Sequence, residues 1–284
     1  MAFNIPRAQH ERLLLDDAPH GDLTTETLGV ADRPGLMRFV ARGPMVAALS
    51  VEATAILEIA GAQVDLRVRD GQALSGGDEI LFARGSASAL LRGWKVAQTL
   101  IEIWSGVATS ARAIVEAARA ASPEVAVACT RKHIPGAKEF AVAAVKAGGA
   151  TMHRLGLSET ILVFPEHRAF LPDESLSDLS ARMRAAAPEK TLVIEVKTKD
   201  EGVAAARAGF DVIQAEKFSP GEISALVAAT REMASPPLVA AAGGVNPSNA
   251  RDYALAGARL LVTSAPYYAP PRDVSVRIFA AAPS

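Results

Sequence analysis

Charged side chains gather at four places in the second half of the sequence, each at the end of a short apolar run. Two of these places are basic, and two pair a glutamate with a lysine. Arg and Lys side chains bind polyanionic substrates, whereas two carboxylates can hold a divalent metal ion. The pattern therefore predicts an anion site beside a metal held by Glu195 and Glu216. The residues concerned are Arg131 and Lys132, His153 and Arg154, Glu195 and Lys197, and Glu216 and Lys217.

A pair of glycines, Gly243 and Gly244, stands between an apolar run and a helical segment that Asn246 or Ser248 could cap. Glycines at such a junction expose backbone N–H groups to an anion, and the last loops of a barrel often bind phosphate. A glycine pair also makes a tight turn, and a single charged residue at a strand end is often only solvated. Their joint occurrence is what favours a site. The candidate phosphate-binding residues are Gly243, Gly244, Thr263 and Ser264.

The elements that must position these residues follow a regular rhythm. From about residue 122, short apolar runs alternate with amphipathic segments, which is typical of parallel βαβ units. No dinucleotide glycine fingerprint follows the first run, so an α/β barrel, closed or nearly closed, is favoured over a Rossmann sheet. In such barrels the reacting groups lie at the C-terminal ends of the strands, where the charged residues and the glycine pair fall.

The first 85 residues have a different pattern, with short strand-like runs between Gly and Pro turns and a helical pattern over Val51–Ala62. Residues 86–121 are mostly helical, and the SGVAT segment, Ser105–Thr109, is predicted to break them into two helices. We therefore predict an N-terminal α/β domain with linking helices over residues 1–108 and a catalytic barrel over 109–267. The tail, 268–284, is expected to pack back on the first domain.

The composition excludes several classes of protein. The 30 basic and 31 acidic residues give a net charge of -1, which lacks the basic surplus of a nucleic-acid binder. A single cysteine, Cys129, and five scattered histidines provide neither a disulfide framework nor the spacing of a zinc site. The N-terminus is charged where a signal peptide needs an apolar core, and no apolar run reaches roughly 18 residues. We expect a cytoplasmic protein that binds small anionic molecules, and neither nucleic acid nor membrane.

One long segment resembles a known family. TRKHIPGAKEFAVAAVKAGGATMHRLGL, from Thr130 to Leu157, is similar to the signature of quinolinate phosphoribosyltransferase. The resemblance extends to HGDLTT at residues 20–25, to SGVAT, and more weakly to the end of the chain. It implies a type II phosphoribosyltransferase fold, which is an incomplete α/β barrel with an N-terminal α/β sandwich domain. It also implies a homodimer, with a higher oligomer left open, that uses phosphoribosyl pyrophosphate and Mg²⁺.

Residue by residue, the resemblance implies roles for the candidates. Arg131, Lys132, His153 and Arg154 match cations that bind the substrate carboxylates and phosphoribosyl pyrophosphate, and we count Lys132 also among the catalytic residues. Glu195 matches a glutamate near the ribose and metal, Glu216 stands where the family usually has an aspartate, and the glycine pair matches the 5′-phosphate loop. Arg92 matches an arginine that reaches into the partner subunit's site.

The sequence departs from the quinolinate enzymes at three places. Phe164 replaces a substrate-binding lysine, Lys197 replaces an acidic residue, and residues 240–242 read Ala-Ala-Ala where Glu-Ser-Ser is usual. These departures are typical of the ModD branch, which is encoded alongside molybdate transport. The resemblance therefore implies a pyrophosphorylase with an altered aromatic acceptor and a link to molybdenum use. Lys197 is the one candidate cation that could replace the missing lysine.

Two other functions are weighed against this one. A Schiff-base lyase could use Lys197 as its nucleophile, although Glu195 two residues away favours the protonated, non-nucleophilic lysine. The chain could also be a non-catalytic binding or regulatory protein that keeps the fold and has lost the chemistry.

Overall fold

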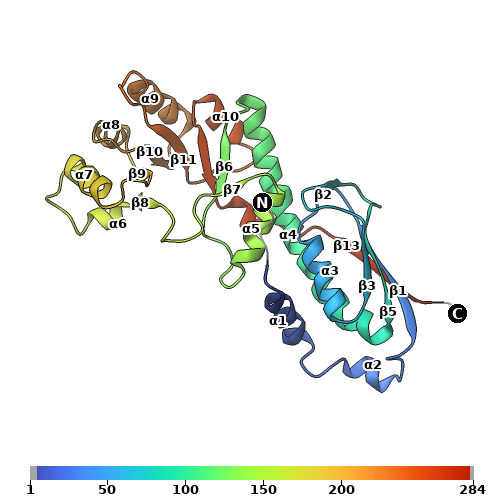
Figure 1. The fold of residues 1–284 in the computed structure, drawn as a ribbon. Coiled ribbons are helices and arrows are strands. Elements are labelled where there is room, and N and C mark those ends of the chain that lie inside the picture. Colours follow the sequence, from blue (N-terminus) through green and yellow to red (C-terminus); the bar gives the residue numbers. More distant parts are fainter. Residues whose placement is uncertain (1–4, 282–284) are drawn as a thin grey trace. The chain divides into compact units, whose positions relative to one another are not determined.

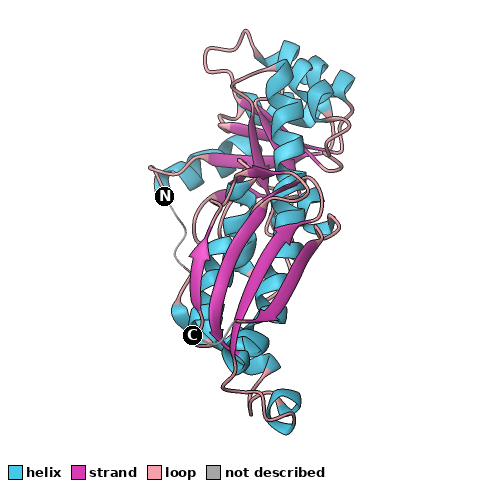
Figure 2. Cartoon of the chain, turned by 90° about the vertical axis from the view of Figure 1, so that its right-hand side faces the viewer, coloured by secondary structure: helices cyan, strands magenta, loops and turns pink. Residues whose placement is uncertain are grey.

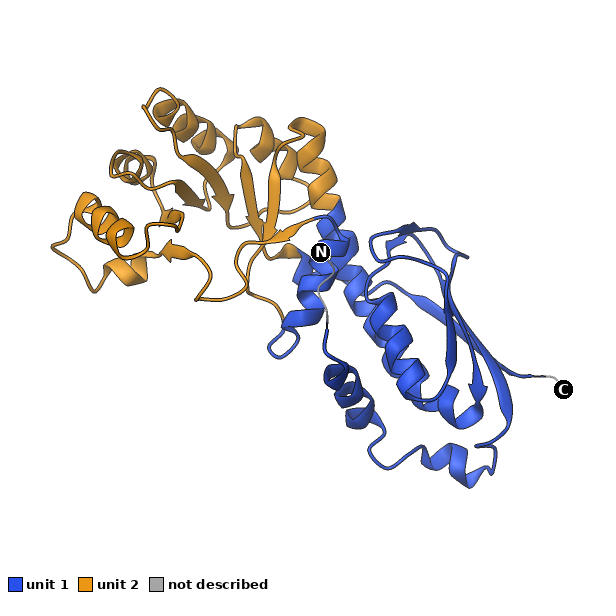
Figure 3. Cartoon of the chain, viewed as in Figure 1, with its two compact units in different colours: residues 1–112, 134–149, 266–284 blue, residues 113–133, 150–265 orange. Residues whose placement is uncertain are grey.

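The computed structural model describes residues 5–281, so residues 1–4 and 282–284 of the predicted domains lie outside the described part. The chain forms two compact units (Figure 3). Unit 1 holds the chain up to Arg112, residues 134–149 and the chain from Pro266, and unit 2 holds residues 113–133 and 150–265. Residues 134–149, which the sequence-based division places in the barrel domain, thus belong to unit 1.

Unit 1 is built on a four-stranded antiparallel sheet of order β13-β1-β5-β3, with helices against one of its faces (Figure 2). Because β13 pairs along the whole of β1, the C-terminal strand joins the N-terminal sheet. The strands are β1 (Pro34–Ala41), β3 (Gln63–Leu66), β5 (Glu79–Ser86) and β13 (Val274–Ala280), with a separate pair of β2 (Met45–Val46) and β4 (Ala73–Leu74).

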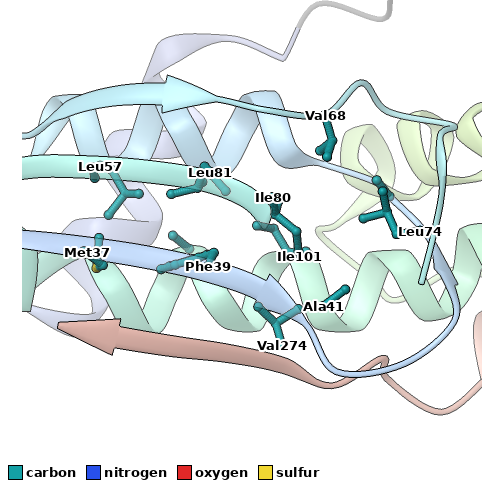
Figure 4. Close-up of a cluster of buried hydrophobic side chains, with 14 of the residues drawn as sticks. Met37, Phe39, Ala41, Leu57, Val68, Leu74, Ile80, Leu81, Ile101 and Val274 are labelled. Atoms are coloured by element: carbon teal, nitrogen blue, oxygen red, sulfur yellow. The ribbon is translucent and has the colours of Figure 1, made fainter. Parts of the chain in front are cut away.

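The helices of unit 1 cover this sheet with apolar side chains. Met37 and Phe39 of β1 alternate with outward residues and meet Leu57 of α3 and Ile101 of α4 in a fully buried cluster (Figure 4). Burying side chains of this size stabilises the unit by about 1.5 to 3 kcal/mol each. The helices are α1 (Arg7–Asp17), α2 (Leu23–Thr27), α3 (Ser50–Ile59), α4 (Ala87–Ala121) and α5 (Lys138–Ala147), with a 3₁₀ turn, η1 (Ala265–Tyr268), at the boundary with unit 2.

The predicted break at Ser105–Thr109 is wrong, because α4 runs unbroken through it. The small polar residues there make tertiary contacts: Ser105 Oγ accepts from the Ala48 N–H at 3.1 Å, and Thr109 Oγ1 accepts from the Val46 N–H at 2.9 Å. Gly106 is needed for close packing, since a Cβ at this position would clash with the carbonyl oxygen of Pro270.

Unit 2 is a curled parallel sheet of seven strands, of order β7-β6-β12-β11-β10-β9-β8, with helices packed along it (Figure 1). Since β7 and β8 are the sheet's outer strands and do not pair with each other within the described chain, the barrel is incomplete, as predicted. The strands are β6 (Ala126–Cys129), β7 (Thr151–Met152), β8 (Ile161–Val163), β9 (Leu192–Val196), β10 (Val212–Glu216), β11 (Leu238–Ala242) and β12 (Leu260–Thr263), and the helices are α6 (Pro165–Arg168), α7 (Leu176–Ala186), α8 (Lys199–Arg207), α9 (Pro220–Thr230) and α10 (Ala250–Leu255).

Apart from the outer strand β7, the strands of unit 2 are short, mainly apolar runs with buried residues on both faces, as expected for a parallel sheet covered by helices. Polar side chains at the N-caps begin several helices: Ser175, Thr198 and Ser219 each accept a backbone N–H from the first turn of α7, α8 and α9. No helix within residues 5–281 combines the length and the apolar character needed to cross a membrane.

Candidate active site

A cavity of about 570 Å³ opens at the C-terminal ends of the strands of unit 2. It is lined by residues of the five strands β8 to β12 and by the loops that follow β6, β7 and several of the other strands, and every lining residue belongs to unit 2. This is the end at which α/β barrels carry their reacting groups. The site can therefore be described within one unit.

The basic side of the cavity follows β6 and β7. Arg131 and Lys132 come directly after β6 and Thr130, whose hydroxyl accepts the Lys132 N–H at 3.2 Å. His153 and Arg154 come directly after β7, and Arg154 is buried. Burial, followed by the charge of Arg131, lowers the pKa of Arg154, and burial, followed by Arg154, lowers that of His153. Positive charge is thus crowded into a poorly solvated corner, which a bound anion would relieve.

Phe164 lies beside this basic corner. The guanidinium carbon of Arg154 lies over the Phe164 ring, 5.7 Å from its centroid, a cation–π geometry. The ring also stacks on His167, with centroids 5.8 Å apart, and the Phe164 N–H donates to His167 Nδ1 at 2.9 Å. Two neighbours therefore hold the residue that departs from the quinolinate pattern, and it presents an apolar surface to the cavity.

The acidic side is formed by Glu195 of β9, Glu216 of β10 and Glu166 at the start of α6. Burial raises the pKa of Glu195, and the nearby charges of Glu216 and, less strongly, Glu166 raise it further. The Gln214 amide opposes this by donating to Glu195 Oε2 at 2.9 Å. Carboxylates that repel one another in this way favour a cation or a proton between them.

The glycine pair turns the chain sharply after β11. Gly243 and Gly244 both have φ of +82°, a backbone angle that residues other than glycine rarely adopt. A Cβ at Gly243 would lie 2.8 Å from Glu216 Oε1, so the absence of a side chain leaves room for that carboxylate. Lys217, another cavity residue, has φ of 60°, a strained backbone of the kind found at functional sites.

The loop after the glycines differs from the prediction. The helix does not follow them directly: α10 begins at Ala250, and its N-cap is Asn249 rather than Asn246 or Ser248. Asn246 instead stabilises the loop, because its side chain donates to the Gly244 carbonyl and accepts the Ser248 N–H.

The structure brings together all but two of the predicted site residues. Lys197 does not line the cavity: β9 ends at Val196, and the exposed Lys197 is held through its backbone N–H, which donates to Glu201 Oε2. Arg92 lies on α4 in unit 1, where its guanidinium donates to the Ala60 carbonyl at 3.2 Å. Its reach into a partner's site stays a prediction. The residues assembled in the cavity are Arg131, Lys132, His153, Arg154, Glu195, Glu216, Gly243, Gly244, Thr263 and Ser264.

Sequence reasoning missed Gln214 and Glu166. Gln214 is two residues before Glu216, and the alternation of side chains along a strand places both on one face. Its polarity within an apolar strand was the signal that could have identified it. Glu166 follows Phe164 and Pro165 in the sequence, and no sequence pattern indicates that it belongs to the site.

The residues present fit a magnesium ion only together with a substrate. Within residues 5–281, no group of three or more His, Cys, Asp or Glu side chains is arranged to bind a metal. Mg²⁺ commonly uses one or two carboxylates and completes its shell with water and substrate phosphates. Glu195 and Glu216, on neighbouring strands in one cavity, suit that mode.

The fold defines the class of protein. NadC from Streptococcus pyogenes superimposes with a TM-score of 0.88 over 98% of this chain and 99% of its own, at 22% identity. The nicotinate-nucleotide pyrophosphorylase of Francisella tularensis gives 0.87 over 98% and 99%, at 20% identity. The chain therefore has the fold of these proteins, an incomplete α/β barrel with an N-terminal α/β domain, as predicted.

The sequence then identifies the family. The models of the quinolinate phosphoribosyl transferase N-terminal and C-terminal domains match residues 22–105 and 107–277. This chain belongs to the quinolinate phosphoribosyltransferase family, whose members are pentosyltransferases, and the predicted family is confirmed.

Proteins that carry two different names are similar to this chain over most of its length. A Rhodobacter capsulatus protein named as the pyrophosphorylase ModD is 49% identical over 241 residues, 84% of this chain and 92% of its own. Its namesake in Escherichia coli O6:H1 is 39% identical over 280 residues, 98% of each chain. The carboxylating nicotinate-nucleotide pyrophosphorylase of Mycobacterium leprae is 30% identical over 268 residues, 93% of each.

Proposed function

We propose that the protein transfers the phosphoribosyl group of phosphoribosyl pyrophosphate to a ring nitrogen of an aromatic acceptor and releases pyrophosphate. The observation that carries this proposal is one cavity that combines the cations Arg131, Lys132, Arg154 and Lys217 with paired glutamates and a glycine turn at the strand ends of a barrel. The cations suit the charge of the diphosphate, and the glycine turn, which has open space beside Gly244, suits the 5′-phosphate.

The chemistry follows from this arrangement. The lone pair of the acceptor nitrogen forms a bond to C1 of the ribose while the bond from C1 to the pyrophosphate oxygen breaks, and pyrophosphate leaves with that electron pair. Because the old bond lengthens before the new one is complete, C1 becomes electron-poor in the transition state, and the Glu195 and Glu216 carboxylates stabilise it. Arg131, Lys132 and Arg154 stabilise the charge on the leaving group. Acceptors that are already nucleophilic at nitrogen need no further base.

Magnesium is proposed as the cofactor, with Glu195 and Glu216 as its protein ligands. When bound, Mg²⁺ neutralises part of the pyrophosphate charge and so makes it a better leaving group. The surroundings of Glu195 support this choice: burial and, less strongly, the charge of Glu216 raise its pKa, and a bound cation would compensate the buried negative charge.

The acceptor is proposed to differ from quinolinate. Phe164 faces the cavity where the quinolinate pattern has a lysine, and Lys197, the one predicted substitute, lies outside the cavity. A second carboxylate would therefore meet an aromatic ring in place of an ammonium group. The position of Lys197 also weakens the lyase alternative, which needs this lysine inside the site. The resemblance to the ModD branch extends the proposal to a cytoplasmic role in molybdenum use.

Titration calorimetry with phosphoribosyl pyrophosphate, with and without Mg²⁺, tests the donor half of the proposal. We expect metal-dependent binding that Glu195→Ala and Gly243→Asp each abolish or strongly weaken. Glu232→Ala, an exposed carboxylate outside the cavity, is the matched control and should bind normally. Unchanged affinity in both cavity variants would show that the site has been misassigned.

A further inference from the structure

The cavity contains a buried amide with an unused acceptor. Gln214 of β10 is only 4% exposed and lines the cavity. Its Nε2 donates to Glu195 Oε2 at 2.9 Å, whereas its Oε1 is buried and has no hydrogen-bond partner anywhere in residues 5–281. Leaving a buried acceptor unpaired costs roughly 1 to 3 kcal/mol, so such an atom inside a substrate cavity points to a ligand that pairs with it.

The strand register explains why no protein group reaches this oxygen. Gln214 lies between Glu195 on β9 and Ala240 on β11. Glu195 takes the NH₂ group, and the methyl group of Ala240 offers no donor. The cavity residues Leu162, Ala242 and Val262 are also apolar.

The orientation of the amide is fixed by chemistry. With Glu195 ionised, as it must be to hold a cation, its carboxylate only accepts hydrogen bonds, so turning the amide over would place two oxygens against each other. Gln214 must therefore keep its NH₂ group toward Glu195 and its oxygen toward the remaining space. The atom of Gln214 that is left to pair with a ligand is thus a hydrogen-bond acceptor and not a donor.

The neighbouring groups agree with this polarity. Phe164 contributes an apolar ring, and Glu166 contributes a carboxylate at the same cavity. A substrate carboxylate placed near Gln214 would face oxygen atoms and an aromatic ring, whereas an N–H group would find an acceptor. The cations that could bind one acceptor carboxylate, Arg131 and Arg154 among them, follow β6 and β7, and Arg154 lies over the Phe164 ring.

We propose that the acceptor is a planar nitrogen heterocycle that donates an N–H, from an amino or lactam group, to Oε1 of Gln214, which makes Gln214 a specificity-determining residue. This inference rests on the proposed phosphoribosyl transfer, and it names the class of acceptor. The proposed acceptor keeps one anionic group, which the cations of the cavity bind. It carries an N–H donor in place of the second carboxylate of quinolinate.

Pyridine-3-carboxylates that differ at one ring carbon test the proposal. The probes are 2-aminonicotinate, 2-methylnicotinate and quinolinate, together with 6-aminonicotinate and 6-methylnicotinate. An amino and a methyl group have nearly the same size, so each pair differs mainly in the N–H donor. Binding to the full chain loaded with phosphoribosyl pyrophosphate and Mg²⁺ is measured by calorimetry, and pyrophosphate release is measured in parallel.

In at least one pair the amino compound should bind roughly tenfold or more tightly than its methyl partner, and more tightly than quinolinate. Gln214→Met, which keeps the length of the side chain and removes its acceptor, should bring the amino-to-methyl ratio close to one. Phe164→Leu is the matched control: it weakens both members of a pair and keeps their ratio.

Equal binding within both pairs, or no binding of either amino compound, would overturn the inference, and the wild-type comparison decides this even if Gln214→Met does not fold. The experiment tests the proposed transfer separately. If the amino compounds bind more tightly than their methyl partners but no probe releases pyrophosphate, the result would contradict the transfer and support the acceptor class. Release at equal efficiency from all probes would support the transfer and contradict the acceptor class.

Discussion

At the scale of single residues, Phe164 shows how a substitution changes a site without changing its fold. The sequence marks it as a departure, and the structure shows its ring held between Arg154 and His167 at the cavity. An ammonium group at this position could pair with a substrate carboxylate, which an aromatic ring cannot do. The specificity of the site is therefore expected to depend on this residue.

The first prediction is that quinolinate is a poor acceptor. Removing the charge partner of a desolvated carboxylate typically costs about 3 to 5 kcal/mol, which is roughly a hundred- to several-thousand-fold in kcat/KM. Steady-state pyrophosphate release should therefore be far slower with quinolinate than with a better acceptor. Phe164→Lys should raise the quinolinate value, whereas Phe164→Leu should not. Wild-type turnover of quinolinate at about 10⁴ M⁻¹s⁻¹ or more would contradict this prediction.

The second prediction compares the two glycines of the turn. Gly243→Ala and Gly244→Ala both place a methyl group at φ of +82°, a strain of about 1 to 2 kcal/mol, but only the first collides with Glu216. Gly243→Ala should displace that carboxylate and weaken Mg²⁺-dependent binding of phosphoribosyl pyrophosphate roughly tenfold more than Gly244→Ala does. Calorimetry and urea unfolding of both variants measure the two effects. Equal losses of affinity would mean that Glu216 is not needed for binding.

At the scale of elements, tertiary contacts decide what local pattern cannot. SGVAT reads as a helix break, yet α4 continues because Ser105 and Thr109 accept hydrogen bonds from the backbone of the segment before α3, and Gly106 packs against Pro270. Those partners are distant in sequence, so no local signal contains them. The same limit applies to Lys197, the candidate replacement cation: β9 ends at Val196, and the Lys197 N–H is held by Glu201 outside the set of residues that line the cavity.

The first turn of α3 contains a carboxyl group that should couple folding to pH. Glu52 is 8% exposed, and burial, followed by the charge of Asp70, raises its pKa to about 7. The unfolded chain ionises this group near 4.5, so folding retains its proton between these two pH values. The contribution of this group to the free energy of unfolding is therefore most favourable below pH 4.5, and it is lost as the pH rises through 7. At pH 8 the ionised group costs about 3 kcal/mol.

The third prediction is therefore that Glu52→Gln stabilises unit 1 at pH 8 more than at pH 5. Both tryptophans of the chain, Trp94 and Trp104, lie in unit 1, so their fluorescence during urea unfolding reports this unit. Glu58→Gln, which removes an exposed charge from the same helix, is the matched control. A difference between Glu52→Gln and wild type that stays the same from pH 5 to pH 8 would show that Glu52 does not titrate as stated.

At the scale of the whole molecule, the sequence predicted the architecture well and its polar details less well. The alternating apolar runs locate the strands of unit 2 along the chain. The charged residues at the ends of these runs predict many of the residues that line the cavity, because parallel strands end at the same edge of a sheet. Gln214 was missed because its partner Glu195 is on another strand, and this pairing depends on the register between β9 and β10.

The last prediction is that each active site is shared between two copies of the chain. Arg92 matches a substrate-binding arginine, yet it belongs to unit 1, whereas every cavity residue belongs to unit 2. In a two-fold dimer, equal mixing of Arg92→Ala and Glu195→Ala subunits gives half hybrids, and each hybrid has one intact site if sites are shared. Two inactive proteins should then regain about a quarter of wild-type pyrophosphate release.

Two controls separate sharing from misfolding. Arg92 donates to the Ala60 carbonyl at the end of α3, so Arg92→Ala must first show wild-type unfolding by tryptophan fluorescence. If it does not, Arg92→Gln replaces it, because glutamine removes the cation and still offers an N–H donor to that carbonyl. Differently tagged subunits that purify together establish exchange. With exchange established, no recovery of activity would mean that each chain completes its own site, because a hybrid of unshared sites contains one Arg92 defect and one Glu195 defect and no intact site.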